Sequence, residues 1–386
     1  MTKKYKICVV SSSRADFGLL TPLLKTIQTS EQLSLFFIAT GAHLSREHGY
    51  TIKEVESSGI TVNCKIDISV DNSSAKKIAD TISRATTKFA HKLFEISPDI
   101  VLLLGDRYEM LGIASAAMSL SIPLAHIHGG EVTEGANDDA IRHAITKLSH
   151  IHFVCHDIYK KRVIQLGEKP ETVFNTGALS IDNVKNNINI SRNELENQLN
   201  IKFLTTNIMV GYHSATLDRD DEKACVIMLE DLSKLEETTL ILTMPNADFG
   251  GKTIAHLFSD FCRKHKNAYL FDNLGSQRYI SCLSHADFVI GNSSSGILEA
   301  PFLGCYTINI GTRQQGRLQA QTVMNVTPYR GEIYRLVMKL KEEILINGRP
   351  KENHLFGDGS ASKKISSILE NEVTRVNTKK SFHDIY

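Results

Sequence analysis

The 386-residue chain lacks an excess of charge of either sign and lacks any long hydrophobic run. Its net charge of +1 excludes a broad basic surface for nucleic acid or an anionic membrane, so any phosphate recognition must be local. The apolar run near the N-terminus, residues 7–10, is too short for a signal peptide, and no run approaches the length of a membrane span. We therefore expect a cytoplasmic protein with no nucleic-acid partner and no membrane partner.

The chain also lacks several motifs that would indicate particular chemistry. Its seven cysteines are scattered without a CxxC pair. An odd number of cysteines without metal-ligand spacing indicates reduced thiols in the core of a cytoplasmic protein. No GxGxxG follows the first strand of either half, and no GxxxxGK(S/T) occurs. The first absence argues against a tightly bound dinucleotide, and the second argues against a P-loop.

What the chain does contain is an alternation of short apolar runs and helical stretches, which predicts an α/β fold with parallel sheets. Two Rossmann-like domains are expected, at residues 1–180 and 181–365, with a polar connection at residues 183–206. The tail, residues 366–386, is expected to pack back toward the first domain. Because polar groups follow the strands of both halves, we expect a cleft between the two domains.

In the first domain, polar and charged side chains follow successive predicted strands. The strands are expected at residues 6–10, 35–39, 99–104 and 122–127. The carboxyl ends of parallel strands meet at one edge of a sheet, so the side chains that follow them are expected to lie close together. These side chains are Arg14, Asp16, His43, Asp106, Arg107, His128 and Glu131. For His43 alone, a solvated loop histidine is the commoner interpretation, whereas a carboxylate just past a strand is more often functional.

The segment after the last of these loops predicts a helix that carries paired charges. Asp138 and Arg142 are four residues apart, as are Asp139 and His143, so the members of each pair are neighbours on the helix. Ile145 lies on a different face, toward the core. Taken alone, the pattern is more typical of a surface helix with ion pairs. The accumulation of charged and imidazole side chains at one edge of the sheet favours a functional site.

The second domain has its clearest signal at residues 287–317. A short strand ends at a glycine, and the polar turn that follows contains Ser293, Ser294 and Gly296 at the start of a predicted helix. Backbone N–H groups, hydroxyls and the helix dipole at such a start favour an anion. Glu299 falls in the first helical turn, where a carboxylate can accept two ribose hydroxyls. A serine N-cap with ordinary surface arginines explains the same local pattern about equally well.

Several motifs resemble one known family, the hydrolysing UDP-N-acetylglucosamine 2-epimerases of bacterial sialic acid synthesis. The motifs include SSSRADFGLL, LLLGDRYEML, HIHGGEVTEGANDDAIRHAITKLSHIHF, IGNSSSGILEAP and INIGTRQQGR. The resemblance covers nearly the whole chain. It implies a two-domain architecture like that of the GT-B glycosyltransferases. It also implies a UDP-sugar substrate and a homo-oligomer, since relatives are commonly dimers or tetramers.

The resemblance also implies roles for individual residues. Asp106 and Asp138 match active-site carboxylates, with Arg142 beside Asp138. Positions matching the family's substrate and nucleotide contacts are Arg14, Asp16, His213, Asn246, Ser276, Ser293, Ser294, Glu299 and Arg313. His43, Arg107 and Gly296 are further substrate-binding candidates. One departure matters: many relatives have His-x-Glu-x-Gly where this chain has His128, and Glu131 is the candidate that serves instead.

The chemistry that the resemblance implies is removal of the C2 proton of UDP-N-acetylglucosamine and loss of UDP. Water then adds to the resulting 2-acetamidoglucal to give N-acetylmannosamine, a route that requires no cofactor and no metal. The alternative is the same reaction on UDP-2,4-diacetamido-2,4,6-trideoxyglucose, on the path to legionaminic acid. A glycosyltransferase of the same fold is less expected, because GDR and DDAIRHA are epimerase-like. A remote alternative, for which His128 is the one favourable feature, is a UDP-sugar-binding regulator that has lost catalysis.

Overall fold

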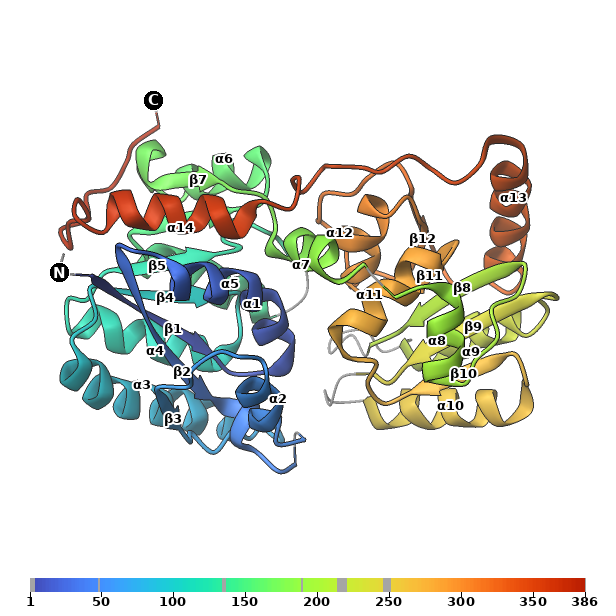
Figure 1. Cartoon of the computed structure of the whole chain (residues 1–386), viewed down its shortest axis with the longest axis horizontal. Helices are drawn as coiled ribbons and strands as arrows, with labels where there is room; N and C mark the ends of the chain where they lie inside the picture. The colour runs from blue at the N-terminus through green and yellow to red at the C-terminus, as the bar shows by residue number, and fades with distance from the viewer. Residues whose placement is uncertain are drawn as a thin grey trace. The chain divides into compact units, whose positions relative to one another are not determined.

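The computed structural model describes residues 4–47, 49–133, 137–188, 190–213, 221–245 and 251–385. The chain divides into two compact units. The first unit contains residues 1–131, 137–183 and 356–386, and the second contains residues 132–136 and 184–355. Each unit is built on one parallel β-sheet with helices packed on its faces (Figure 1). The predicted α/β fold is confirmed.

The first unit contains the N-terminal sheet. Its strands are β1 (Tyr5–Ser11), β2 (Leu33–Thr40), β3 (Cys64–Ile66), β4 (Ile100–Leu104), β5 (Leu124–Ile127), β6 (Ile151–Val154) and β7 (Val173–Asn175). Its α-helices are α1 (Arg14–Thr29), α2 (Ile52–Ser57), α3 (Ala75–Ile96), α4 (Tyr108–Ser119), α5 (Asn137–Leu148), α6 (Asp157–Gln165) and α14 (Ala361–Glu372). Two 3₁₀ turns, η1 (Gly41–Leu44) and η2 (Pro170–Thr172), lie in its described loops. The strands lie in the order β3-β2-β1-β4-β5-β6-β7.

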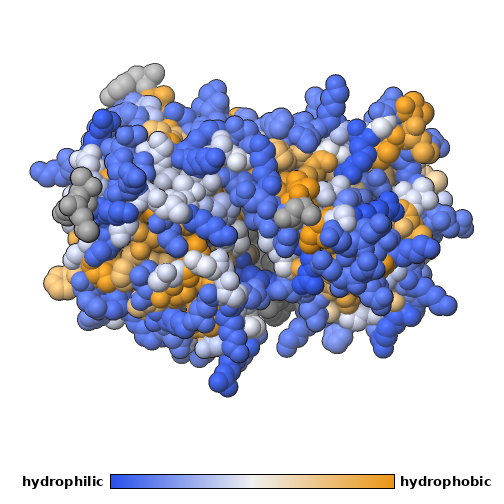
Figure 2. Space-filling model, in the orientation of Figure 1, coloured by the Kyte–Doolittle hydropathy of each residue, from blue (hydrophilic) through white to orange (hydrophobic). Residues whose placement is uncertain are grey.

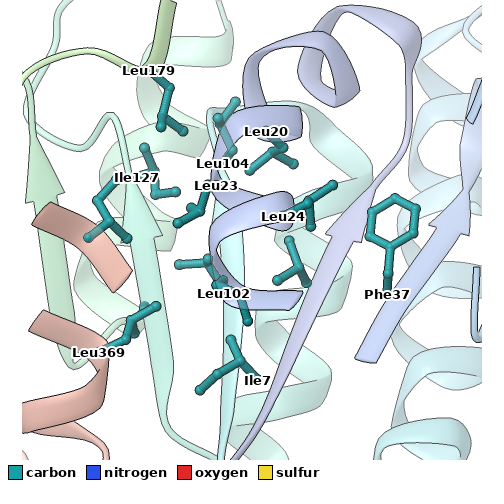
Figure 3. Close-up of a cluster of buried hydrophobic side chains, with 14 of the residues drawn as sticks. Ile7, Leu20, Leu23, Leu24, Phe37, Leu102, Leu104, Ile127, Leu179 and Leu369 are labelled. Carbon is teal, nitrogen blue, oxygen red and sulfur yellow. The ribbon is translucent and has the colours of Figure 1, made fainter. Parts of the chain in front are cut away.

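The two faces of this sheet carry separate hydrophobic clusters, because alternate residues of a strand point to opposite faces. Ile7 and Val9 of β1 pack on one face with α1 and α14. Cys8 and Val10 pack on the other face with α3 and α4. Figure 3 shows the first cluster, whose labelled members include Leu20, Leu23, Leu24, Leu102, Ile127 and Leu369. β4, β5 and β6 are thus buried on both faces, so polar groups that a ligand can reach gather at the strand ends.

The C-terminal segment belongs to the first unit from Phe356, earlier than the start at residue 366 expected from the sequence. α14 packs beside α1, and its apolar side chains join the same cluster. The Asp182 carboxylate accepts the backbone N–H groups of Ala361 at 2.9 Å and Ser362 at 2.8 Å. This carboxylate satisfies donors at the helix start that otherwise lack partners, and so fixes the position of α14.

The second unit contains the C-terminal sheet. Its strands are β8 (Thr206–Gly211), β9 (Thr238–Thr243), β10 (Ala268–Phe271), β11 (Phe288–Gly291), β12 (Tyr306–Ile310) and β13 (Val323–Val326). Its helices are α8 (Arg192–Leu199), α9 (Asp221–Leu232), α10 (Gly251–Lys264), α11 (Gly275–His285), α12 (Ser295–Phe302) and α13 (Glu332–Asn347). The strands lie in the order β10-β9-β8-β11-β12-β13.

The polar segment expected to be a connection is largely helical. α7 (Leu179–Asn187) runs across the boundary of the two units, and α8 follows within the second. Ser191 and Glu194 form a capping box at the start of α8, which explains why so polar a segment forms a helix. Its one fully buried side chain, Leu195, joins the hydrophobic cluster of the second sheet.

Hydrophilic residues cover most of the face shown in Figure 2, with hydrophobic patches between them. None of the described helices combines the length and the apolar character needed to cross a membrane.

Candidate functional site

Four neighbouring strands of the first unit bring most of the predicted residues to one edge of the sheet. β1, β4, β5 and β6 lie side by side and parallel, so their carboxyl ends share this edge. The direction in which strands are added changes between β1 and β4, and α/β sheets bind ligands at such a switch point. We call the loops at these four strand ends the first-unit edge.

Arg142 of α5 is the centre of the charged groups at the first-unit edge. Its buried guanidinium forms an ion pair with Asp106 and donates from Nη1 to the Glu131 carbonyl oxygen at 3.0 Å. Nη1 also lies 3.4 Å from the Asp139 carboxylate. Burial lowers the pKa of Arg142, but Asp106, Glu131 and Asp139 outweigh this effect and raise the pKa above its ordinary value. The charged arginine therefore ties the loop after β4 to the loop after β5.

Asp138 and Asp139 both lie in the first turn of α5, but their surroundings differ. Asp138 is exposed. Asp139 lies 3.4 Å from Arg142 Nη1 and 3.4 Å from His143 Nε2, so the predicted pair of Asp139 and His143 is present. A ligand can reach the Asp138 carboxylate from solvent without breaking the ion pairs of Arg142.

His128 and Glu131 form a second polar group in the loop after β5. His128 Nδ1 lies 2.5 Å from Glu131 Oε1, and His128 Nε2 is buried with no hydrogen-bond partner among the described residues. The backbone of His128 has a φ of 69°, a left-handed conformation that few non-glycine residues adopt but that histidine tolerates. Cys155, directly after β6, places Sγ 3.5 Å from the same Glu131 oxygen. The imidazole and the carboxylate lie within hydrogen-bond distance of each other, an arrangement that suits acid–base chemistry.

His126 connects the loop after β4 with α5 from inside the unit. Its Nε2 lies 2.7 Å from the Gly105 carbonyl oxygen, and its Nδ1 lies 3.1 Å from Thr146 Oγ1. Burial lowers the pKa of His126 to about 3, so the ring is neutral at ordinary pH. Because a carbonyl can only accept, Nε2 carries the proton and Nδ1 accepts from the threonine hydroxyl. His126 thereby fixes the peptide that precedes Asp106.

Asp16 shapes the loop after β1. Its carboxylate accepts the backbone N–H groups of Ser12 at 2.8 Å and Ser13 at 2.7 Å, and the Ser11 hydroxyl at 3.1 Å. It also completes the capping box at the start of α1. Both carboxylate oxygens are thus engaged by the loop itself, and a direct contact of Asp16 with substrate stays a prediction. Arg14, the first residue of α1, is exposed.

Glu109 is a buried carboxylate at the same edge that the sequence reasoning missed. Its Oε1 accepts from Ser12 Oγ at 2.7 Å and from Arg107 Nε at 2.5 Å. Its Oε2 is buried without a hydrogen-bond partner in the described part of the chain. Glu109 lies in the first turn of α4, three residues after Asp106 in the GDRYE motif, and that spacing was the signal available in the sequence. Arg107 is thus held against the loop after β1.

His43 does not lie where a ligand can reach it. Its side chain is fully buried, with Nε2 2.9 Å from Ser11 Oγ and Nδ1 2.8 Å from Thr51 Oγ1. Burial lowers the pKa of His43. Both the solvated loop histidine and the direct substrate contact are therefore poor descriptions of this residue. The segment around Thr51 covers His43. His43 in turn contacts Ser11 and so supports the loop after β1 from inside the unit.

The second unit has a corresponding edge, at the carboxyl ends of β8, β11 and β12, which we call the second-unit edge. Asn292 joins its loops. The Asn292 side chain accepts the His213 N–H and donates to the His213 carbonyl oxygen, both at 2.7 Å. The Asn292 carbonyl oxygen accepts from Arg313 Nη1 at 2.9 Å and from Gln314 Nε2 at 2.8 Å. Burial, and next the Arg313 charge, lower the pKa of His213 to about 3, so this histidine is neutral.

The serines and Gly296 lie at the start of α12 on the second-unit edge. Ser294 is the N-cap residue, and Ser293 Oγ accepts the N–H of Ser295 at 3.4 Å. Gly296 is buried against β12, where an added Cβ would lie 2.7 Å from Thr307 Cγ2. Its structural role is therefore close helix–strand packing, and direct substrate binding through Gly296 is not supported by this geometry.

The remaining candidates of the second unit lie around the same helices. Glu299 of α12 is partly buried; burial, and next the Glu299 charge, raise the pKa of Tyr279 on α11. Ser276 is exposed in the first turn of α11. Asn246 lies outside the described residues.

The two edges offer different chemistry. The first-unit edge presents carboxylates, a buried arginine and an imidazole–carboxylate pair, which can take up and release protons. The second-unit edge presents a neutral imidazole, an arginine and a helix start, which can bind an anion. Among the described side chains, His128, Glu131 and Cys155 are the group whose donor atoms lie close enough together to hold a metal ion.

Comparison with known proteins identifies a matching family model and similar enzymes. The family model described as UDP-N-acetylglucosamine 2-epimerase matches residues 25–370. The GDP/UDP-N,N'-diacetylbacillosamine 2-epimerase (hydrolyzing) of Campylobacter jejuni is 44% identical over 83% of this chain and 84% of its own. The UDP-N,N'-diacetylbacillosamine 2-epimerase (hydrolyzing) of Legionella pneumophila is 32% identical over 95% of both chains.

A solved structure shows the same fold. The UDP-GlcNAc 2-epimerase of Neisseria meningitidis, bound to UDP-GlcNAc, superimposes with a TM-score of 0.83 at 18% identity, over 95% of this chain and 100% of that one. The family model and the relatives together confirm the resemblance and the enzyme class predicted from the sequence motifs. The chain belongs to the UDP-N-acetylglucosamine 2-epimerase family.

Proposed function

We propose that the protein is a hydrolysing 2-epimerase of UDP-2,4-diacetamido-2,4,6-trideoxyglucose, which is UDP-N,N′-diacetylbacillosamine. The substrate and one water molecule give UDP and free 2,4-diacetamido-2,4,6-trideoxymannose. This was the alternative substrate of the sequence analysis, on the path to legionaminic acid. The observation that favours it is that two relatives, 44% and 32% identical to this chain, carry this sugar in their names.

The first step removes the C2 proton and breaks the bond between C1 and the diphosphate oxygen, leaving a glycal and UDP. Water then adds across the double bond, with a hydroxyl at C1 and a proton at C2 on the face opposite to the one that was deprotonated. Inversion thus requires two proton-transfer groups, one for each face of the sugar. The first-unit edge supplies two: the carboxylates of Asp106 and Asp138 near Arg142, and the pair of His128 and Glu131.

The arginine keeps these two groups distinct. Arg142 is ion-paired to Asp106 and donates to the Glu131 backbone, so it holds both loops, while Glu131 Oε1 lies beside His128 Nδ1. By the family resemblance, His128 stands at the sequence position of the family glutamate, and we assign the carboxylate role to Glu131, whose Oε1 lies 2.5 Å from His128 Nδ1. This supports an active enzyme over the non-catalytic regulator.

The second-unit edge suits the leaving group. A neutral His213, the Arg313 guanidinium and the start of α12 can bind the diphosphate as negative charge develops on it. We assign Ser293 and Ser294 to the diphosphate and Glu299 to the ribose hydroxyls, following the family resemblance. Ser276 and Asn246 are assigned to the nucleotide pocket on the same ground. The homo-oligomeric state and the cytoplasmic location stay predictions.

UDP-N-acetylglucosamine is the second candidate substrate. The description of the matching family model favours it, and the product would then be N-acetylmannosamine. The two sugars differ at C4 and C6, whereas the proposed proton-transfer groups act at C1 and C2. The mechanism is therefore the same for both.

Proton NMR of the purified protein in D₂O tests the proposal. With UDP-N,N′-diacetylbacillosamine we expect release of UDP and of the mannose-configured sugar carrying deuterium at C2. We expect kcat/KM for this substrate to exceed that for UDP-N-acetylglucosamine about 10²-fold, because a group missing at C4 leaves its partners in the site unpaired. The GDP-linked sugar serves as a third arm, because one relative is named for both nucleotides.

Each other outcome has a definite meaning. A preference for UDP-N-acetylglucosamine would replace the first candidate by the second. Formation of UDP-linked mannose-configured sugar would mean a non-hydrolysing epimerase. UDP binding with no turnover of any of these sugars would support the UDP-sugar-binding regulator that has lost catalysis.

A further inference from the structure

His128, Glu131 and Cys155 bring three kinds of metal-ligand atom together at the first-unit edge. One donor atom from each of the three, an imidazole nitrogen, a carboxylate oxygen and a sulfur, lie within 4.8 Å of one another. The side chains of His128 and Glu131 are 12% and 6% exposed, and Cys155 is buried. No local sequence pattern indicates this group, because Cys155 is far from His128 along the chain and comes beside it only through the pairing of β5 with β6.

The backbone around the three residues is firmly held. The His128 N–H donates to the Phe153 carbonyl oxygen at 2.9 Å, which joins the loop to β6. The Arg142 guanidinium donates to the Glu131 carbonyl oxygen at 3.0 Å. Between them, a Cβ added at Gly130 would lie 2.5 Å from the Tyr159 carbonyl oxygen, so this loop packs closely against α6. Ligand atoms on so fixed a backbone need little rearrangement to bind an ion.

The ligand types select the ion. Thiolate and imidazole are poor ligands for Ca²⁺ and Mg²⁺, which prefer oxygen. A sulfur, a nitrogen and an oxygen suit Zn²⁺, which takes four ligands and leaves the fourth place to water where the protein provides three. A thiolate and a carboxylate together would balance the two positive charges of the ion.

The observed distances are close to what such an ion requires. Zn²⁺ bonds of roughly 2.0–2.3 Å place neighbouring ligand atoms about 3.3–3.8 Å apart. The 3.5 Å between Cys155 Sγ and Glu131 Oε1 already meets this requirement. The 2.5 Å between His128 Nδ1 and Glu131 Oε1 must widen by about 1 Å, which a rotation of the imidazole can supply.

We propose that His128, Glu131 and Cys155 bind Zn²⁺, and that the ion inhibits the enzyme. The ion bonds to a His128 ring nitrogen, a Glu131 carboxylate oxygen and the Cys155 sulfur, whose thiol proton is released to solvent. It thereby removes one of the two proton-transfer groups from the reaction. The inhibition rests on the proposed function, whereas the binding of the ion rests on the geometry alone.

Co²⁺ is the probe that tests binding, because cobalt bound to a thiolate absorbs in the near ultraviolet. Titration of the full-length protein with Co²⁺ should produce this absorption, saturating at about one ion per chain, and Zn²⁺ should abolish it. The absorption should be absent in Cys155→Ser. In His128→Ala, the Co²⁺ affinity obtained from the titration should be at least tenfold weaker. Cys64→Ser, a half-buried cysteine on β3, is the matched control and should keep it.

Thermal unfolding of the wild-type protein with and without Zn²⁺ gives a second readout that needs no variant. Zn²⁺ should raise the Tm, because an ion that binds the folded chain stabilises it. No thiolate absorption in the wild type would overturn the proposal, as would an absorption that persists in Cys155→Ser. Turnover that is insensitive to Zn²⁺ while the absorption is present would overturn the inhibition alone. Because the absorption is measured without substrate, failure of the proposed function leaves the test of binding intact.

Discussion

The first-unit edge and the second-unit edge occupy the same position in their sheets but are built from different groups. At the first, a buried arginine is surrounded by carboxylates, and an imidazole lies within hydrogen-bond distance of a carboxylate. At the second, an asparagine side chain and its backbone connect the loops, and the histidine there is neutral. The first edge can exchange protons, whereas the second can bind an anion without changing its own charge.

In the proposed reaction, the two edges divide the chemistry between them. Elimination needs a base at the sugar and a stabilised leaving group at the diphosphate, and these demands conflict within one cluster of charges. A base must be able to gain a proton, while a phosphate site must stay positive or neutral. Placing each group on its own sheet lets the surroundings of one be set without disturbing the other. Substitutions at the two edges should therefore separate turnover from nucleotide binding.

The largest expected effect is that of Arg142→Ala. Removing the guanidinium leaves Asp106 without its ion pair and frees the Glu131 loop. We expect kcat to fall roughly 10²–10⁴-fold, the range of a lost acid–base arrangement. We also expect the free energy of unfolding to fall by about 3–5 kcal/mol, the usual loss when one partner of a buried ion pair is removed. Turnover assays and urea unfolding measure the two changes.

Arg263→Ala provides the matched control, because Arg263 is 77% exposed and pairs only with Asp260 on its own helix among the described residues. Its unfolding free energy should change by no more than about 0.5 kcal/mol. Arg142→Lys keeps the charge and should recover part of the stability if the alanine variant does not fold. If UDP affinity, measured by calorimetry, fell as much as kcat in Arg142→Lys, the separation of the two edges would be wrong.

Asp138→Asn should lower kcat by a similar factor, roughly 10²–10⁴-fold, without a change in stability. The Asp138 side chain is exposed in the first turn of α5, and substitution of an exposed side chain usually changes the free energy of unfolding by no more than about 0.5 kcal/mol. Asp139→Asn is the paired variant: it weakens contacts to Arg142 and His143 and should lower the unfolding free energy by about 1 kcal/mol. Measuring kcat and urea midpoints for both variants distinguishes them. Equal losses of kcat in the two variants would mean that Asp138 contributes only to the negative charge at the start of α5 and does not itself transfer a proton.

The sequence was sufficient to predict the α/β fold and the strand ends that carry the site. Apolar runs bounded by polar turns identify buried parallel strands, and parallel strands necessarily bring their carboxyl ends to one edge. The neighbourhood of Asp106, Arg142 and Glu131 follows from that rule. Their roles in catalysis stay predictions.

The rest depended on contacts between residues far apart in the chain. His43 is buried because the segment around Thr51 covers it, and no local pattern indicates this. Glu109 becomes part of the first-unit edge only because β1 lies beside β4, which brings Ser12 to it. Gly296 has a φ in the ordinary range, so its backbone conformation does not require glycine. Glycine is required because a side chain at this position would collide with Thr307. Such facts arise from which elements become neighbours, and a single sequence does not state them.

Acid should destabilise the first unit through Glu168, which lies between α6 and η2. Burial acts to raise the pKa of Glu168, but hydrogen bonds from His152, Lys147 and Lys380 outweigh it and lower the pKa to about 2. The folded pKa lies below the unfolded one, so the stabilisation is complete above about pH 4.5 and is lost as the pH falls toward 2. The shift corresponds to roughly 3 kcal/mol.

Urea unfolding of Glu168→Gln against pH tests this expectation. The variant should be less stable than the wild type at pH 7, and the difference should shrink as the pH falls below about 4.5. Lys380 lies after α14 in the C-terminal segment, so the same loss should loosen the chain around Lys380. Glu95→Gln, whose partner Lys92 lies on the same helix and whose own side chain is 68% exposed, is the control, and its unfolding free energy should change by less than about 0.5 kcal/mol. A difference that is constant from pH 7 to pH 3 would show that packing, and not charge, holds Glu168.

The smallest expected effect tests the second-unit edge directly. Arg313 Nη1 donates to the Asn292 carbonyl oxygen, and the guanidinium lowers the pKa of His213 after burial has done so. Arg313→Ala should weaken UDP binding about tenfold, which corresponds to roughly 1.4 kcal/mol, because one charge-assisted contact to the diphosphate is lost. At saturating substrate, kcat should fall less than in Arg142→Lys, since proton transfer at the first-unit edge is intact.

Arg313→Lys is the conservative variant and should restore UDP affinity only in part. Lysine lacks the planar guanidinium, which can donate to the backbone and to a phosphate at the same time. Calorimetric titration with UDP and turnover at saturation give the two numbers. If Arg313→Ala reduced kcat as strongly as Arg142→Lys with unchanged UDP affinity, Arg313 would belong to proton transfer, and the contrast between the two edges would not hold.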